Sequence, residues 1–529
     1  MDSKMVETVG NPTAPQVGCL LALVYVAALY VYAECLELFR KNKSKQDEPQ
    51  KDVEMLDQSS ENKPLTPLKV MTQVLPTSTL LRAAQLRPEA VLECKELLRN
   101  TMEFGLILGW FFVADRSGIV PDGEKTYSRD FLMFFMFLLT AAFMWKSLPV
   151  TKTKGAPLNR DQTEEWKGWM QVLFLLYHYF EAKELYNAIR LFIAAYVWMT
   201  GFGNFSYYYV RKDFTLGRFA HMMWRLNFFV FFCCAVLSNS YVLYYICPMH
   251  TIFTLFIYGI LGVASQYNTS NTGIAIKIAF CFALVGLLWE TPGVFKTVFR
   301  PLEWLVGYTD PRKPDIDPLH EWEFRSGLDR YIWIWGMICA YMHPRFEKVL
   351  NWLDDMNQNY ALAIRSSIVA ACAVLGAVYY EHIYCLPKLE YNAVHPYTSW
   401  IPLTLFIVLR NVTPTLRSVH IANYAFLGKI TLETYIAQFH IWLSTANVPN
   451  AQPAKLMVLI DGYPLMNFFL CTALYILISH RVFNVTNNIK FLMLPLKDNK
   501  ALLYNFGIMT GLLTICYIIA LVLHATVWV

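Results

Sequence analysis

Residues 17–38 of the chain read VGCLLALVYVAALYVYAECLEL. A helix needs about 20 mostly apolar residues to cross a hydrocarbon core of about 30 Å, and this run is long enough. The apolar core of a signal peptide is shorter and is followed by a small-residue cleavage site, which this sequence lacks. We therefore expect residues 1–40 to form a retained N-terminal transmembrane helix.

Apolar blocks of similar length recur along the rest of the chain. Hydrophobic residues make up 56% of the 529 residues and charged residues 16%, whereas soluble proteins carry about 25% charged residues. The mean hydropathy is +0.33. We predict an all-α polytopic integral membrane protein with about 12–14 transmembrane or membrane-buried helices. Beyond the first helix, the candidate spans lie near residues 101–114, 129–149, 166–183, 186–209, 226–240, 241–265, 274–297, 329–343, 363–384, 398–411, 419–443, 463–487 and 503–526.

Charge placement predicts the domain organisation and the orientation in the membrane. Residues 41–97 are polar, and we interpret them as a mostly disordered cytosolic loop that precedes one polytopic domain over residues 98–529. Basic residues gather at 40–45, 146–167 and 210–225, and such residues favour the cytosolic side. Counting spans alternately then places the N-terminus and segment 115–128 in the lumen.

Several common catalytic patterns are missing from the sequence. The twelve cysteines form no CxxC pair, and most of them lie inside apolar blocks. GxSxG, HExxH and P-loop motifs do not occur either. We predict no metal site, no permanently bound cofactor and no nucleic-acid partner.

Lys167 and His178 are the first pair of candidate functional residues. Ionisable side chains inside membrane spans are costly, so each is a candidate for function. The eleven residues that separate them make about three helical turns, or about 16 Å, so both project from one face. The cation suits an anionic cofactor at the cytosolic mouth of a tunnel, and the imidazole suits a general base. The alternative for His178 is a packed side chain that donates to a backbone carbonyl.

Arg218 and Arg225 belong to a basic segment at the predicted cytosolic interface. Arginine can grip phosphate groups through two hydrogen bonds, which favours cofactor binding. Positive charge on the cytosolic side, or contact with anionic lipids, is the alternative.

Arg325 and Asp329 lie in a charged run, His320 to Tyr331, that precedes an apolar span. Their i, i+4 spacing allows an ion pair on one helix face. Such a pair could lock the start of the helix, or the two side chains could hold a cofactor or a sugar.

Glu433 and His440 lie in the stretch Leu427 to Trp442, which has many polar groups for an apolar helix. Seven residues are two helical turns, so both face one side, and the carboxylate could orient the imidazole. The two groups could also be satisfied separately.

Four strings carry a family resemblance: Asn159 to Gln171, Trp198 to Tyr209, His320 to Tyr331 and Leu427 to Trp442. They resemble the plant reduced-wall-acetylation proteins and the membrane domain of the sialic-acid and capsule-polysaccharide O-acetyltransferases, over about residues 98–526. We expect no N-terminal luminal esterase-like domain of the kind that the latter carry, which is the arrangement of the plant proteins. The step from Lys167-Gly168 to His178 is also similar to the acyltransferase-three superfamily, in which an arginine takes the place of Lys167.

The resemblance implies the function and a set of roles. We expect an acyltransferase-three-like bundle in the Golgi membrane that uses cytosolic acetyl-CoA to O-acetylate xylan, pectin, xyloglucan or mannan. The implied roles are acid–base or covalent catalysis by His178, His440 and Glu433; acetyl-CoA binding by Lys167, Arg218, Arg225 and Arg325; and acceptor binding by Glu165, Trp166 and Asp329.

Three functions remain open from the sequence. The chain could transfer the acetyl group itself, either to the polymer or to a separate luminal esterase-like transferase. It could instead transport acetyl-CoA or an acetyl carrier, although no inverted repeat is evident. A scaffold that recruits luminal transferases would leave the ionisable residues inside the spans without explanation.

Overall fold

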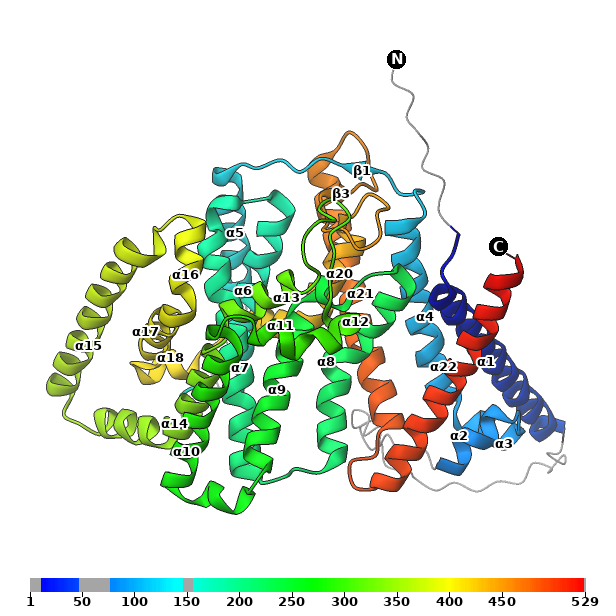
Figure 1. The fold of residues 1–529 in the computed structure, drawn as a ribbon, viewed down its shortest axis with the longest axis horizontal. Coiled ribbons are helices and arrows are strands. Elements are labelled where there is room, and N and C mark those ends of the chain that lie inside the picture. The colour runs from blue at the N-terminus through cyan, green and yellow to red at the C-terminus, as the bar shows by residue number, and fades with distance from the viewer. Residues whose placement is uncertain (1–10, 47–76, 146–155, 528–529) are drawn as a thin grey trace, which may run out of the picture. The chain divides into compact units, whose positions relative to one another are not determined.

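The computed structural model describes residues 11–46, 77–145 and 156–527 and divides the chain into two units (Figure 1). The first unit comprises Met1–Trp110, Thr215–Arg225 and Arg481–Val529, and the second comprises Phe111–Phe214 and Leu226–His480. Each unit is described by itself. Three helices belong to both: α4 (Lys95–Arg116), α8 (Leu216–Leu237) and α21 (Pro464–Met493).

The first unit is built on the packing of α1 (Ala14–Gln46) against α22 (Asn499–Val527). The backbones approach closely at Gly18, where an added Cβ would lie 3.3 Å from Cα of Tyr517. The predicted N-terminal helix is therefore present, and it continues beyond residue 40. Within the predicted loop, residues 47–76 lie outside the described residues, while α2 (Thr77–Ala84) and α3 (Pro88–Glu93) are helical.

The second unit contains the remaining helices, and the all-α prediction is confirmed. They are α5 (Arg129–Trp145), α6 (Arg160–Phe180), α7 (Tyr186–Arg211), α9 (Ile246–Gly262), α10 (Asn271–Val285), α11 (Val294–Phe299), α12 (Glu303–Val306), α13 (His320–Leu328), α14 (Ile332–Asp354), α15 (Gln358–Tyr379), α16 (Lys388–Thr398), α17 (Trp400–Asn411), α18 (Pro414–Ser418), α19 (Ala422–Lys429) and α20 (Thr431–Ile441). Short 3-10 and π turns join some of them, among them η2 (Tyr241–Tyr244).

Glycines bring α6 against α19 so closely that the backbones touch. A Cβ added to Gly168 of α6 would lie 1.8 Å from the carbonyl oxygen of Tyr424, and one added to Gly428 of α19 would lie 1.9 Å from that of Glu164. The contact is reciprocal, and its pairing shows that the two helices are antiparallel. Small residues allow this approach between membrane helices.

A second helix pair, α7 and α14, is also brought into backbone contact by glycines. A Cβ added to Gly201 would lie 2.0 Å from the carbonyl oxygen of Trp333, and one added to Gly336 would lie 2.3 Å from that of Trp198. These two helix pairs form the frame of the second unit.

A small antiparallel sheet closes one end of this unit. Its strand order is β1 (Asp122–Gly123), β3 (Lys455–Met457), β2 (Leu443–Ser444), with Leu443 opposite Leu456 and Asp122 opposite Met457. The sheet joins the segment that follows α4 to the segment that follows α20. It thereby brings together two parts of the chain that are far apart in sequence.

Seven helical segments in the described parts of the chain are long and apolar enough to cross a membrane. They are Ala14–Asn42, Lys95–Arg116, Leu216–Leu237, Asn271–Glu290, Gln358–Tyr384, Pro464–Met493 and Asn499–Val527. The sequence predicted a larger number because it included membrane-buried helices such as α6. That helix carries Gln162, Glu164, Glu165 and Gln171 as buried residues, so its polar side chains face protein.

Candidate functional site

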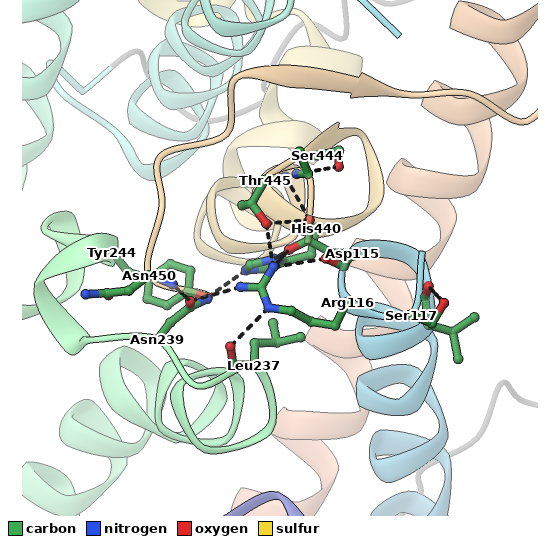
Figure 2. A network of polar contacts seen from close by, with 12 residues as sticks. Asp115, Arg116, Ser117, Leu237, Asn239, Tyr244, His440, Ser444, Thr445 and Asn450 are labelled. Atoms are coloured by element: carbon green, nitrogen blue, oxygen red, sulfur yellow. Dashed lines mark hydrogen bonds and ion pairs between the residues drawn. The ribbon is translucent and has the colours of Figure 1, made fainter. Parts of the chain in front are cut away.

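A buried polar network joins the end of α4 to the end of α20 (Figure 2). Asp115 accepts a hydrogen bond at Oδ2 from Nδ1 of His440 at 2.7 Å, and His440 Nε2 lies 2.6 Å from the hydroxyl of Tyr244. All three side chains are fully buried. Arg116 completes the centre of the network, with Nη1 2.6 Å from the same carboxylate oxygen.

The hydrogen-bond partners fix where the protons lie. Asp115 also accepts at Oδ1 from the backbone N–H and the hydroxyl of Thr445, at 2.8 and 2.9 Å, so it is an ionised acceptor. His440 therefore carries its proton on Nδ1 and offers the lone pair of Nε2. The Tyr244 hydroxyl must then donate to Nε2. The Nδ1–H tautomer of His440 is thus assigned from its hydrogen-bond partners. The result is an Asp–His–Tyr chain with one direction of donation.

Asn239 holds the far end of this chain. Its Oδ1 accepts from Arg116 Nη2 at 3.0 Å and from the backbone N–H of Asn450 at 2.8 Å, so its Nδ2 points the other way. Nδ2 donates to the Tyr244 oxygen at 3.0 Å. Arg116 Nε also caps the C-terminal carbonyl of α8, at Leu237, at 3.2 Å. The polar atoms of the network are thus satisfied, and their positions are fixed.

The network corrects one predicted pairing. The carboxylate that orients His440 is Asp115, and Glu433 does not have that role, although both lie in the second unit and Glu433 is fully buried in α20. Sequence reasoning missed Asp115 because 325 residues separate it from His440. The adjacent charges of Asp115 and Arg116 at the end of an apolar span were the available signal.

His178 lies in a different environment, near the C-terminal end of α6. Its side chain is half-buried, and within the described residues neither ring nitrogen has a hydrogen-bond partner. Its ring contacts Phe174 and Tyr177 edge-on, with centroids 4.7 and 5.0 Å away. The charges of Lys125 and Arg325 act on the ring. An imidazole with accessible surface and free nitrogens can accept a proton from a hydroxyl group, although the positive charges of Lys125 and Arg325 oppose its protonation.

Arg325 pairs differently from the predicted arrangement. Its Nε donates to Glu321 Oε2 at 3.0 Å, and its guanidinium lies 4.4 Å from the ring centroid of Tyr245. The predicted pair with Asp329 is wrong because α13 ends at Leu328, so Asp329 leaves the helix face that an i, i+4 pair requires. Asp329 lies instead near Arg190 and His395.

Two linked clusters result. Tyr244 belongs to the network of Asp115 and His440, and the next residue, Tyr245, has its ring under the Arg325 guanidinium. The 3-10 turn η2 thereby connects the buried network to a cation whose charge acts on His178. The sequence predicted His178, His440 and Arg325 as site residues, and the second unit holds them in these neighbouring clusters.

At the other end of α6, the predicted site residues make structural contacts. Lys167 Nζ pairs with Glu164 Oε2 at 2.7 Å, and Glu165 Oε2 pairs with Arg410 Nη2 at 2.9 Å. Trp166 is 1% exposed and packs edge-on against Phe406, with ring centroids 4.7 Å apart. Lys167 and His178 do lie on one continuous helix, as the spacing predicts.

Arg218 and Arg225 lie in the first unit, on the part of α8 that belongs to it. The Arg225 guanidinium is 5.1 Å from the ring centroid of Phe483. In the same segment, His221 Nε2 contacts the carbonyl oxygen of Leu494 at 2.7 Å. The residues predicted to bind acetyl-CoA are therefore divided between the two units.

Lys125, in the loop between α4 and α5, has an ammonium group with a perturbed pKa. Burial lowers its pKa from 10.5 to about 8. Its ammonium donates to the carbonyl oxygen of Pro453 at 3.0 Å, across the small sheet. The charge that acts on His178 therefore depends on pH in the mildly alkaline range.

The chain matches a known domain family over nearly its whole length. The family is described as "10 TM Acyl Transferase domain found in Cas1p", and the match covers residues 6–506. The chain belongs to this Cas1p acyltransferase family. This membership is in agreement with the all-α membrane fold and with the predicted likeness to membrane O-acetyltransferases.

This member of the Cas1p acyltransferase family is similar to a curated protein, N-acetylneuraminate (7)9-O-acetyltransferase from Danio rerio. The two are 30% identical over 414 residues, which cover 74% of this chain and 50% of the relative. The chain thus spans about half the length of the curated relative that it matches. No solved structure matches it.

Proposed function

We propose that this chain is a membrane O-acetyltransferase that takes the acetyl group of acetyl-CoA from the cytosolic side and passes it toward the lumen of the Golgi. The acceptor is a hydroxyl group of a cell-wall polysaccharide such as xylan, pectin, xyloglucan or mannan, reached directly or through a luminal transferase. Membership of the Cas1p acyltransferase family supports the acyl transfer. The activity named for the Danio rerio relative supports a sugar hydroxyl as the acceptor.

The environment of His178 is the observation that carries the proposal. Both of its ring nitrogens are free of hydrogen bonds within the described residues, and its side chain keeps accessible surface. His178 takes the proton of the acceptor hydroxyl, whose oxygen attacks the thioester carbon. The carbon–sulfur bond then breaks, and the proton finally resides on the CoA thiol. Arg325, whose charge acts on His178, offers positive charge to the oxyanion of this transition state.

His440 has a supporting role in this proposal, because both of its ring nitrogens are occupied and it has no accessible surface. The Asp115–His440–Tyr244 chain holds η2 in place, and η2 presents Tyr245 to Arg325. The Arg325 guanidinium lies over the Tyr245 ring, and a lysine ammonium, a compact point charge, would not reproduce the shape of this contact. The network thus orients the cation that acts on His178.

The experiment is acetyl transfer by the purified full chain in liposomes, with labelled acetyl-CoA outside and a xylan oligosaccharide inside. Transfer of label together with release of CoA thiol is expected, and His178→Ala should abolish both. His382→Ala, which changes an exposed histidine of the same unit, is the matched control. Entry of label without thiol release would identify a transporter. Equal transfer by wild type and His178→Ala would remove the role of His178.

A further inference from the structure

Arg190, Asp329 and His395 form a second buried cluster of titratable groups in the second unit. They come from α7, from the residue that follows α13, and from α16. Their relative exposures are 2%, 1% and 0%. The cluster lies apart from the network of Asp115, and the proposed reaction does not use it.

The three side chains lie near one another without forming direct hydrogen bonds. Arg190 Nη2 is 3.7 Å from Asp329 Oδ2, and His395 Nε2 is 3.6 Å from Asp329 Oδ1. N–H···O hydrogen bonds measure about 2.7–3.2 Å. In the part of the chain that the structure describes, five buried atoms therefore lack a partner: Arg190 Nε, Arg190 Nη2, Asp329 Oδ1, Asp329 Oδ2 and His395 Nε2.

Such a cluster needs a further group to complete its hydrogen bonds. A buried ionised carboxylate without a hydrogen bond is strongly unfavourable, and native proteins satisfy nearly all such atoms with protein or water. Buried water typically makes about three hydrogen bonds to polar groups that are otherwise unsatisfied. Contacts longer than about 3.5 Å between polar atoms are places where a bridging water is expected.

The charges of the cluster select a neutral ligand. Arg190 is positive and Asp329 is negative. With His395 as the neutral imidazole, the three groups together carry no net charge. A cation at the carboxylate would meet the guanidinium of Arg190 3.7 Å away, and an anion at the guanidinium would meet Asp329. A water molecule, which donates and accepts, fits both sides.

We propose that Arg190, Asp329 and His395 form a binding site for ordered water in the core of the second unit. A water molecule placed to one side of the Arg190–Asp329 pair, or of the His395–Asp329 pair, can lie about 2.8 Å from both atoms of that pair. His395 Nδ1 lies 3.1 Å from the Tyr391 hydroxyl, and we assign the tautomer in which Nδ1 accepts from this hydroxyl and Nε2 carries the proton. His395 Nε2–H then donates to the water, and the water donates to Asp329. The bound water joins α7, the residue that follows α13, and α16, and this site is independent of the proposed acetyl transfer.

A high-resolution map of the intact chain provides the direct test. A density peak within about 2.7–3.2 Å of an Asp329 carboxylate oxygen, and of Arg190 Nη2 or His395 Nε2, is expected. Direct contacts between the side chains at this distance, with no peak beside them, would overturn the proposal. This result does not depend on any activity of the protein.

Radiolytic footprinting provides a second test in solution. X-ray pulses turn bound water into hydroxyl radicals, which oxidise the side chains beside it. His395 and Tyr391 should be oxidised severalfold faster than His440 and Tyr475, which are equally buried but have protein partners for their polar atoms. Equal, low oxidation of all four residues contradicts a water site. In Asp329→Asn, loss of the fast oxidation of His395 is expected, and unchanged fast oxidation would show that the water does not depend on Asp329.

Discussion

Asp115 and His440 share a buried hydrogen bond of 2.7 Å between Oδ2 and Nδ1, although 325 residues separate them in the sequence. Arg116 Nη1 binds the same carboxylate oxygen, and Thr445 binds the other. One ionised carboxylate therefore fixes the tautomer of the histidine and neutralises a buried guanidinium.

Asp115→Asn should destabilise the protein by about 3–5 kcal/mol, because it leaves Arg116 as a buried charge without its counter-ion. Thermal unfolding in detergent measures this loss. Asp130→Asn, at a side chain that is 98% exposed, is the matched control and should leave the unfolding temperature unchanged. Equal stability of the two variants would show that the ion pair at Asp115 contributes nothing.

Tyr244→Phe removes one oxygen from a fully buried ring. His440 Nε2 and Asn239 Nδ2 lose their partners, so a cost of about 1–3 kcal/mol is expected. The control is Tyr504→Phe, at a ring that is 66% exposed. If Tyr244→Phe unfolds at the wild-type temperature, the proton arrangement assigned here is incorrect.

Arg325→Lys should lower acetyl transfer about tenfold or more while the fold is retained, because the contact with the Tyr245 ring and the position of the charge that acts on His178 are both disturbed. Thiol release from acetyl-CoA measures the rate. Arg345→Lys alters an exposed arginine that lies 5.7 Å from the ring centroid of Tyr341, and it should transfer acetyl groups normally. Parallel losses in both variants would point to a general effect of arginine replacement.

Lys125 should give the stability a pH dependence in the alkaline range. Its folded pKa of about 8 lies below the ordinary 10.5, so between these values the folded protein binds fewer protons than the unfolded chain. The contribution of Lys125 to the unfolding free energy therefore rises with pH over this interval. Lys125→Met should remove that rise when unfolding is compared at pH 7 and pH 9. An unchanged pH profile would contradict the assigned pKa.

The glycine contacts predict a large cost for a single methyl group. Gly201→Ala places a Cβ 2.0 Å from the carbonyl oxygen of Trp333, which forces α7 away from α14. A loss of at least about 1–3 kcal/mol is expected from such overpacking. Gly203→Ala on the same helix is the control, since its added Cβ meets no atom within 4 Å. Similar unfolding temperatures for the two variants would show that α7 and α14 can separate freely.

The sequence predicted the features that depend on local periodicity. A helix over the first apolar run and the single helix that carries Lys167 and His178 follow from apolar runs and helical spacing, and both helices are present. The pairing of Arg325 was wrong because the end of α13 decides it: Glu321 lies one turn back within the helix, whereas Asp329 lies outside it.

Partners that tertiary folding brings together could not be read from spacing. Asp115 reaches His440 because the small sheet joins the segments that follow α4 and α20, and no local pattern encodes that pairing. The same limit applies to Asp329, whose neighbours Arg190 and His395 come from α7 and α16.

The reciprocal glycine contacts restrict how an acyl group can pass through the second unit. Where carbonyl oxygens of one helix lie in the space that a side chain would otherwise fill on its neighbour, neither helix can slide or rotate without a collision. His178 on α6 and Arg190 on α7 are thus carried by helices that are each rigidly paired with a neighbouring helix. Any rearrangement that accompanies turnover in this unit must therefore keep α6 with α19 and α7 with α14, so that each pair moves as one rigid body.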